Sequence, residues 1–442
     1  MKRIRILSGA LTHVREPLAA PFGFKGRYLE ELWQTVVRLE SGSFAATAPC
    51  VESVLWSDGA VFGEHSPADS SALMMSVTER ALQLLKGVSF VTPEEVLAQM
   101  LPELKAYADR ICGRSVALTF VLNALVGVDL ALWILYGKEN GLGTFDGLIP
   151  ADVRGHMDRR YSSLARIPLL SYAVDEEEIG RICSSGTGIL KIKIGKAVPG
   201  CADRESDMRA MTEWDTERVK RIHAVASRYS TDLTESGHIL YYLDANGRYD
   251  SLSRVERLLD ACDRAGALDR IVLLEEPFAP DAEIDVGGLP VCVNADESAH
   301  SLEDVRTRMQ MGYGAVALKP IAKTLSVSFR MASAVLEAGG QCLCADLTVN
   351  PFLAEWNKQF AARIPPLKGM GTGCVEVNGD QNYTHWKEMA KLLPEGMEWR
   401  DAENGRFALP KDYYGQSGRL FERNGYDGLF SGAHPEPIIS VF

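Results

Sequence analysis

Two lysines separated by one residue are the first feature of the sequence that could do chemistry. Lys191 and Lys193 stand in the apolar run GILKIKIG, which predicts a β-strand over residues 188–195. Residues two apart in a strand share a face, so both amines point the same way. Each ammonium group disfavours the charge of the other, which is one way to lower the pKa of a lysine and obtain a base near neutral pH. A solvated strand end explains this pair alone equally well.

Carboxylates end the next three apolar runs. Asp244 and Asn246 share a face at the end of HILYYLDAN, although the sequence DANG is also a good turn. The two following runs end in the acidic pairs 275–276 and 296–297, and only one member of each pair can face inward. A single acid is ordinary at a strand end, but neighbouring strands of a barrel bring three of them onto one arc.

A lone lysine ends a later apolar run. In AVALKP, Lys319 follows the apolar residues and a proline stops the strand, with a snorkelling surface lysine as the alternative. The lysine pair lies on the second predicted strand and Lys319 on the sixth. In an eight-stranded ring these strands are opposite, so Lys193 and Lys319 are expected to face each other across the acids.

This combination of groups predicts a particular chemistry. Three neighbouring carboxylates cannot all stay ionised without a cation, and oxygen ligands without histidine or cysteine favour Mg²⁺, with Mn²⁺ next. Removing a proton next to a substrate carboxylate creates an enediolate, which a divalent cation stabilises. One amine can remove the proton, and the other can return it or assist an elimination or cyclisation. The expected partner is therefore a small-molecule carboxylate.

The elements that position these residues form a repeating pattern. From about residue 167, short apolar runs alternate with amphipathic helices, which is typical of βα units and a parallel sheet. Eight such runs predict a closed TIM-type barrel with its chemistry at the C-terminal ends of the strands. The long link over residues 196–216 predicts a loop over the site.

The length of the chain predicts a second domain. A chain of 442 residues exceeds the size of one hydrophobic core. Residues 1–150 predict an α+β domain, residues 151–400 the barrel, and residues 401–442 a tail whose apolar end packs back on the first domain. The strands expected in the first domain cover residues 4–14, 33–41 and 51–67.

Composition excludes several other functions. The formal charge is −12 and no basic stretch is interleaved with aromatic residues, so nucleic acid is not an expected partner. Nine cysteines without metal-like spacing predict reduced thiols in a cytoplasmic protein. The apolar stretch 117–136 contains Asn123 and Asp129, which predicts a buried helix and no membrane span. The N-terminus lacks the pattern of a signal peptide.

The ordered set of polar residues resembles the enolase superfamily, and within it the muconate lactonizing enzyme-like group. The resemblance rests on Lys191-x-Lys193, Asp244, Glu275, Asp296 and Lys319 in this order, and on Gly63-Glu64 with Pro67 and the helix at 128–133. It covers almost the whole chain. It implies an α/β fold, a modified (β/α)7-8 TIM barrel with an N-terminal α+β capping domain that the tail completes, and often a homo-oligomer.

The resemblance also implies roles for individual residues. Asp244, Glu275 and Asp296 would bind Mg²⁺, with Glu276 and Glu297 less favoured because adjacent residues alternate faces unless a bulge intervenes. Lys193 and Lys319 would be the acid/base pair and Lys191 an electrostatic helper, an assignment that follows the known use of Lys bases with Mg²⁺ in this superfamily. The residues expected to contact substrate are Asn246, Asp346 and, from an early loop of the capping domain, Phe24 and Lys25.

Three functions remain open at this point. A racemase or epimerase fits two opposed lysines best, and a lyase or cycloisomerase, such as an acid-sugar dehydratase or a muconate-type enzyme, is the alternative. A non-catalytic metal-binding barrel is the third possibility. The seventh strand lacks the histidine of mandelate racemase-like relatives, and the eighth carries Glu376-Val-Asn378 where dipeptide epimerases carry Asp-x-Asp, so the substrate is not identified.

Overall fold

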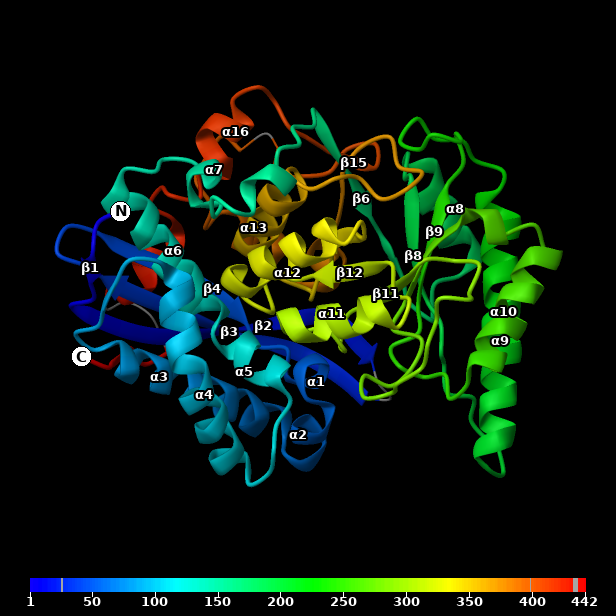
Figure 1. The fold of residues 1–442 in the computed structure, drawn as a ribbon, viewed down its shortest axis with the longest axis horizontal. Helices are drawn as coiled ribbons and strands as arrows, with labels where there is room; N and C mark the ends of the chain where they lie inside the picture. The colour runs from blue at the N-terminus through cyan, green and yellow to red at the C-terminus, as the bar shows by residue number, and fades with distance from the viewer. Residues whose placement is uncertain (25–26, 398, 432–435) are drawn as a thin grey trace.

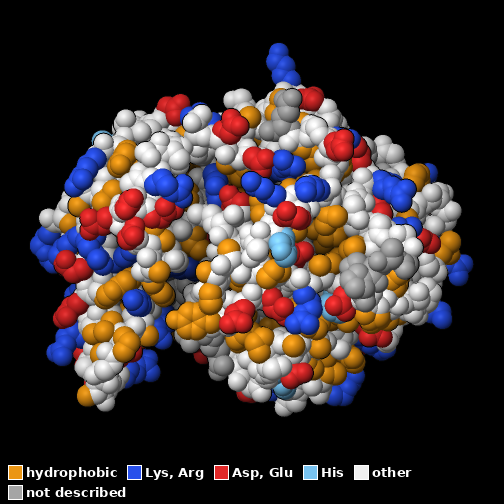
Figure 2. Space-filling view, turned by 180° about the vertical axis from the view of Figure 1, so that it is seen from behind, with side chains coloured by type: hydrophobic (Ala, Val, Ile, Leu, Met, Phe, Trp, Pro, Cys, Tyr) orange, Lys and Arg blue, Asp and Glu red, His pale blue; other side chains and the backbone are white. Residues whose placement is uncertain are grey.

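The computed structural model describes residues 1–24, 27–397, 399–431 and 436–442, with no description of the side chains of residues 22–27. Figure 1 shows two parts: a capping domain, blue to cyan, with both chain termini, and a barrel, green to orange, beside it. Figure 2 shows Lys and Arg side chains interspersed with Asp and Glu on one face of the molecule, so the net negative charge is not gathered in one patch there.

The barrel is a parallel sheet that curls until its two ends meet. Its strands are β6 (Ser163–Ile167), β7 (Leu169–Leu170), β8 (Ile189–Lys193), β9 (Leu240–Asp244), β10 (Ile271–Glu275), β11 (Val293–Ala295), β12 (Ala315–Leu318), β13 (Gln341–Cys344) and β14 (Cys374–Glu376). β6 pairs with β14, and β7 pairs with β8 at the other end of the strand order. Only Pro168 separates β6 from β7, so the two act as one interrupted first strand, and the predicted barrel is confirmed.

One strand of this sheet was not predicted. β15 (Arg406–Ala408) pairs antiparallel with the start of β6. β8 leaves this edge of β6 open, because β8 pairs with β7 on one side and with β9 on the other. At three residues, β15 is too short to give an alternating pattern in the sequence.

Helices follow most of the barrel strands. They are α8 (Glu176–Ser184), α9 (Arg204–Ala226), α10 (Leu252–Arg264), α11 (Leu302–Gln310), α12 (Leu325–Glu337) and α13 (Pro351–Ala361). The prediction of a loop over residues 196–216 is wrong beyond residue 203, because α9 begins at Arg204. Asp203 accepts a hydrogen bond from the backbone N–H of Ser206, and the Ser206 side chain closes a capping box there.

The capping domain contains a four-stranded antiparallel sheet and packed helices. The strands, in spatial order, are β16 (Ile439–Ser440), β2 (Ser8–Phe24), β3 (Arg27–Glu40) and β4 (Ala45–Val51), and a separate pair joins β1 (Ile4–Arg5) to β5 (Ser89–Phe90). The helices are α1 (Val54–Ser57), α2 (Gly59–Glu64), α3 (Pro67–Leu85), α4 (Pro93–Cys112), α5 (Leu118–Ala124) and α6 (Val126–Asn140). The last residues of the chain thus lie on the first domain.

Two predictions for this domain are wrong. Residues 51–67, expected as a strand, form the end of β4 and then helices, because Asp58 accepts hydrogen bonds from the N–H groups of Ala60 and Val61 and caps α2. Residues 21–24 and 27–28, expected as part of an early loop, instead belong to β2 and β3, which pair with each other as antiparallel strands.

The apolar stretch at residues 117–136 forms two buried helices, α5 and α6. Within the described residues no single helix is long and apolar enough to cross a membrane. By length and composition alone, α5 and α6 taken together would be, but they are bent by 48° relative to each other. The two polar residues noted in the sequence, Asn123 and Asp129, have partners inside the protein. Asn123 bonds to the backbone of Val51 and Ser53, and Asp129 accepts from the N–H of Ser326.

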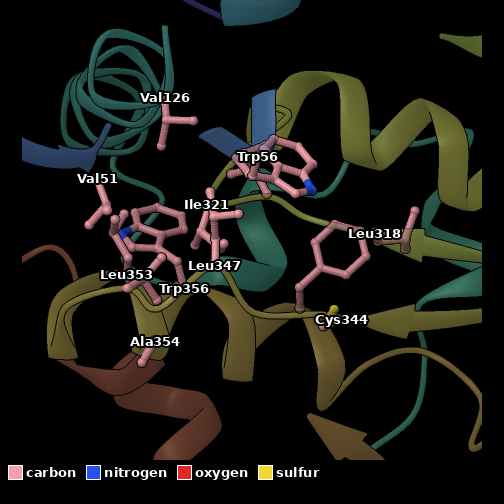
Figure 3. Close-up of a cluster of buried hydrophobic side chains, with 14 of the residues drawn as sticks. Val51, Trp56, Val126, Leu318, Ile321, Cys344, Leu347, Leu353, Ala354 and Trp356 are labelled. Carbon is pink, nitrogen blue, oxygen red and sulfur yellow. The ribbon is translucent and has the colours of Figure 1, made fainter. Parts of the chain in front are cut away.

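The two domains share one core at their junction. Trp133 on α6 donates to the Ser326 hydroxyl on α12 at 3.0 Å. Figure 3 shows Val51 and Val126 of the capping domain facing Trp356 on α13 of the barrel. The shared core fixes the capping domain against the ends of the barrel strands. The remaining short helices are α7 (Phe145–Leu148), η1 (Arg154–His156), η2 (Leu268–Arg270), α14 (Gly379–Asn382), α15 (Trp386–Ala390), α16 (Tyr413–Gln416), η3 (Ser417–Arg419) and η4 (Gly425–Phe430).

Candidate active site

The C-terminal ends of the barrel strands open into one cleft beneath the capping domain. Side chains of both domains line the cleft, and its opening is in part to solvent. The structure brings most of the predicted site residues together in its lining: Lys191, Lys193, Asp244, Asn246, Glu275, Asp296, Lys319 and Asp346. Lys25 and the side chain of Phe24 lie outside the described residues, so their predicted contacts with substrate stay predictions.

Lys191 on β8 is enclosed by acids. Its Nζ atom lies 3.0 Å from Glu275 Oε1, 3.1 Å from Glu376 Oε2 and 3.1 Å from Asp244 Oδ2, and 4.7 Å from the centre of the Tyr242 ring. Burial alone would lower the pKa of Lys191, but these carboxylates raise it well above its ordinary value. The expectation that the lysine pair lowers this pKa is therefore wrong for Lys191, because three acids outweigh one neighbouring amine.

Lys193 reaches further into the cleft than Lys191. Its side chain is 14% exposed against 4% for Lys191. The Nζ atom donates to Asp244 Oδ2 at 2.6 Å and to Asn246 Oδ1 at 2.7 Å. Asp244 and Asn246 thus face the same side of the strand end, as the two-residue period predicted, and hold this amine where a substrate can meet it.

The three candidate metal ligands are buried at the ends of adjacent strands. Asp244 on β9, Glu275 on β10 and Asp296 after β11 are each 1% exposed or less. Glu276 instead turns away from the cleft, at a φ of 40°, and accepts from the backbone N–H of Asp296 at 2.7 Å. Glu276 and Glu297 are not in the described lining, so the cleft presents Glu275 and Asp296.

Lysines keep two of these acids ionised. Burial would raise the pKa of Asp244, but Lys193 and Lys191 outweigh it and hold that pKa below its ordinary value. Burial is likewise outweighed at Asp296, whose pKa Lys319 and an additional residue, Lys323, lower strongly. For Glu275, burial dominates and raises the pKa.

The donor set fits a hard divalent cation. Three buried carboxylates from adjacent strands face one cleft, and oxygen donors are the ligands that Mg²⁺ and Mn²⁺ prefer. As the side chains lie, however, no group of three acids, histidines or cysteines among the described residues is close enough to hold an ion. The carboxylate oxygens are engaged by amines, so metal binding requires these side chains to exchange hydrogen bonds for coordination.

Lys319 stands at the other end of the arc of acids. Its Nζ atom lies 2.5 Å from Asp296 Oδ2 and 4.5 Å from the centre of the Trp56 ring, which the capping domain supplies. Burial lowers the pKa of Lys319, but Asp296 and Glu275 together raise it above its ordinary value. The capping domain therefore helps to orient a barrel residue of the site.

Lys323 is a residue of the site that sequence reasoning missed. Its fully buried Nζ atom lies 2.7 Å from the carbonyl oxygen of Asp296, 3.1 Å from Asp296 Oδ1 and 3.3 Å from the carbonyl oxygen of Ala317. It lies in the loop between β12 and α12, where a lysine ordinarily faces solvent. No local sequence signal marks it as buried.

Glu376 on β14 was also missed. Its Oε2 atom accepts from Lys191 and, at 3.0 Å, from the backbone N–H of Asp346. The shared face of Glu376 and Asn378 at the end of the eighth barrel strand could have identified it. Asp346 lines the cleft, but its carboxylate oxygens accept hydrogen bonds from the N–H groups of Asn378 and Val349. Burial, and after it the negative charge of Glu376, raises the pKa of Asp346 to about 7.

No protein-family model matches the sequence, and the comparison with curated proteins found no match. A solved dipeptide epimerase from Cytophaga hutchinsonii, complexed with Mg and D-Ala-L-Val, is 15% identical, with 99% of this chain and 100% of that chain covered and a TM-score of 0.66. A muconate lactonizing enzyme from Pseudomonas fluorescens, complexed with muconolactone, is 17% identical over 92% of this chain and 94% of that chain, with a TM-score of 0.66. An enolase superfamily member from Listeria innocua is 15% identical over 99% of this chain and 100% of that chain, with a TM-score of 0.67. These likenesses confirm the predicted architecture: the chain has the fold of the enolase superfamily.

Proposed function

We propose that the protein is a Mg²⁺-dependent enzyme that removes the proton from the carbon next to the carboxylate of a small-molecule substrate. Lys193 and Lys319 are the acid/base pair, and the reaction inverts the configuration at that carbon, as in a racemase or epimerase. Asp244, Glu275 and Asp296 hold the metal ion, with Mn²⁺ as the alternative ion.

The main support for this proposal is the position of one lysine at each end of an arc of buried acids. Lys193 bonds to Asp244 at one end, and Lys319 bonds to Asp296 at the other, with Glu275 on the strand between them. A substrate held at this arc has an amine on either side. One lysine can therefore take a proton from one face of the carbon, and the other can deliver a proton to the opposite face.

The other groups of the cleft stabilise the charge that this step creates. When bound, the divalent ion supplies positive charge for the enediolate oxygens. Lys191 adds a buried positive charge between Asp244, Glu275 and Glu376. Its burial makes this charge more effective than the same amine would be in water.

Two dipeptide epimerases with this fold, from Enterococcus faecalis and Cytophaga hutchinsonii, are complexed with Mg, which supports the choice of ion. The muconate lactonizing enzyme with the same fold keeps a lyase or cycloisomerase as the second candidate. The pair Glu376 and Asn378 stands where the Asp-x-Asp of dipeptide epimerases is expected, so the substrate of this chain need not be a dipeptide.

The proposal is tested by exchange in D₂O. The enzyme with Mg²⁺ is incubated with a panel of racemic 2-substituted carboxylates, and deuterium at the carbon next to the carboxylate is measured by NMR and mass spectrometry. Exchange is expected with both enantiomers. Lys193→Ala and Lys319→Ala should each reduce, by about 10²-fold or more, exchange of the enantiomer whose proton faces the lost lysine, which is the ordinary contribution of a positioned acid or base. A new double bond or ring in the product supports the second candidate.

Lys220→Ala is the matched control. Lys220 lies on α9, with its side chain 43% exposed and paired to Glu217, so its loss should leave exchange unchanged. Exchange that persists at the wild-type rate in both site variants contradicts the assignment of the lysines. Exchange with none of the acids, together with a biological role that survives both substitutions, supports a non-catalytic metal-binding barrel.

A further inference from the structure

The cleft has a polar side and an apolar side. The lysines and acids at the strand ends form the polar side, together with Ser53, Asn246, Thr348 and Asn378. The apolar side chains of the lining come from both domains and are each 9% exposed or less: Leu18, Leu29, Leu32, Trp56, Leu169 and Leu347. Because the described lining combines these two sides, a ligand whose carboxylate meets the polar side must place another part of itself against the leucines.

The capping-domain part of this apolar wall is held by the barrel. Leu18 forms an isolated antiparallel bridge with Tyr383, which follows α14 of the barrel domain. The N–H of Thr384 donates to the carbonyl oxygen of Pro17 at 3.1 Å. The part of the β2–β3 hairpin that is far from its Ser8–Glu40 end carries Leu18, Leu29 and Leu32, and it is therefore tied to the loops around the strand ends.

Trp56 and Leu347 are fixed by packing. Figure 3 shows Trp56 from the capping domain close to Ile321 and Leu347 from barrel loops, within one buried cluster. Trp56 and Leu347 are 5% and 8% exposed, and both line the cleft. An apolar wall that is already packed loses little conformational entropy when a ligand covers it, so it favours an apolar group of matching shape.

The polar side chains nearest to Leu347 are largely used within the protein. The Thr348 hydroxyl donates to Asn378 Oδ1 at 3.1 Å. The Asp346 carboxylate accepts from the backbone N–H groups of Val349 and Asn378. A polyhydroxylated chain placed there would leave hydroxyl groups without partners against the leucines, which costs free energy. An apolar group meets no such cost.

We infer, on the basis of the proposed function, that the substrate is a carboxylic acid whose reacting carbon carries a hydrophobic group, branched aliphatic or aromatic. Its carboxylate lies at the acids and lysines, and its hydrophobic group lies against the leucines and Trp56. An acid sugar, the substrate class of the dehydratase alternative, would place hydroxyl groups against the leucines and should bind less well than such an acid.

Binding of two acids of matched shape tests this inference without requiring turnover. 4-Methylpentanoate and succinamate have similar size, but one ends in an isopropyl group and the other in a carboxamide. Calorimetry of the full-length protein with Mg²⁺ should show binding of 4-methylpentanoate about tenfold tighter or better. Equal or tighter binding of succinamate overturns the inference. Each added CH₂ in a series of straight-chain acids should tighten binding about fourfold while the wall has room.

Two leucine variants test whether the binding preference arises at the apolar side of the cleft. Leu32→Asn should reduce the preference for 4-methylpentanoate by about tenfold, whereas Leu7→Asn, at a leucine that is 55% exposed on the capping domain, should leave it unchanged. An unchanged preference in Leu32→Asn overturns the inference.

Exchange in D₂O should likewise be faster for N-acetyl-leucine than for N-acetyl-asparagine. If N-acetyl-asparagine and gluconate exchange and no acid with a hydrophobic group does, the inferred substrate class is overturned and the proposed function stands. A preserved binding preference with no exchange of any acid overturns the proposed function itself.

Discussion

The Nζ atom of Lys323 lies 2.7 Å from the carbonyl oxygen of Asp296 and 3.1 Å from its Oδ1 atom. Lys319 occupies the other carboxylate oxygen of the same residue. Asp296 is therefore held through both its backbone and its side chain by two buried amines. This arrangement orients the carboxylate towards the cleft and offsets the cost of burying its charge.

Replacing Lys323 should destabilise the fold. In Lys323→Met one of the two amines on buried Asp296 is lost while Lys319 still pairs with the carboxylate, so the cost is that of a hydrogen bond to a charged group, about 1.5–3 kcal/mol. Urea unfolding followed by circular dichroism measures the change. Lys220→Met, at an exposed ion pair on α9, should change stability by less than about 1 kcal/mol. A loss below about 1 kcal/mol in Lys323→Met would show that Lys323 is dispensable for holding Asp296.

Gly195 should tolerate alanine much less well than Gly200 does. Both glycines have positive φ, at 78° and 89°, which costs an alanine about 1–2 kcal/mol. A Cβ at Gly195 would also lie 2.8 Å from the carbonyl oxygen of Ala245, whereas nothing lies within 4 Å at Gly200. The difference in unfolding free energy between Gly195→Ala and Gly200→Ala isolates the steric contact.

The same pair of variants reports on the site. Gly195 follows Lys193 by two residues, and its N–H donates to both oxygens of buried Asp215 at 2.8 Å. Displacing this backbone should move Lys193, so deuterium exchange should fall in Gly195→Ala and not in Gly200→Ala. Equal stability and equal exchange in the two variants would show that the close packing of the Ala245 carbonyl against Gly195 is needed neither for the fold nor for the site.

The sequence was most informative where side chains end barrel strands. The two-residue period placed Lys191 and Lys193 on one face, and the closure of the barrel brought the acids of three adjacent strands into one cleft. These positions could be predicted because a parallel barrel collects all C-terminal strand ends at one face.

Other features depend on tertiary contacts that no local pattern records. The buried amine of Lys323 contacts Asp296 and lies 6.0 Å from the centre of the Trp56 ring, and both residues are distant from it in the sequence. Residues 51–67 alternate in a way that favours a strand, yet Asp58 caps a helix there, because short polar side chains can serve either turns or helix starts. The pKa of Lys191 depends on Glu376, which lies 185 residues further along the chain.

Magnesium should stabilise the folded protein. An ion that binds the native arc of acids and not the unfolded chain adds about 2.7 kcal/mol at a concentration about 100 times its Kd. Differential scanning calorimetry should therefore show Tm rising with Mg²⁺ and falling after treatment with a chelator. The shift should be lost in Asp244→Asn and kept in Asp207→Asn, whose carboxylate lies on the surface helix α9. A Tm that is independent of Mg²⁺ would contradict the assigned ligands.

Asp129 should make stability depend on pH at the junction of the two domains. Burial, partly offset by the hydrogen bonds from Ser326, raises the pKa of Asp129 to about 7 from an ordinary value of 3.8. Between these values the folded protein holds a proton that the unfolded chain has lost. The resulting stabilisation is complete below about pH 4 and disappears as the pH rises through 7.

Asp129→Asn should remove this contribution, because asparagine is neutral at every pH in the range. Between pH 5 and pH 8 the wild type should lose about 2–3 kcal/mol more unfolding free energy than the variant, measured by urea titration at each pH. Other buried acids, such as Asp215 with its pKa raised to about 7 by burial, act in the same direction in both proteins and cancel in this difference. Parallel pH profiles for the two proteins would mean that Asp129 is ionised in the folded state throughout the range, and that its contacts with Ser326 outweigh the cost of burying its charge.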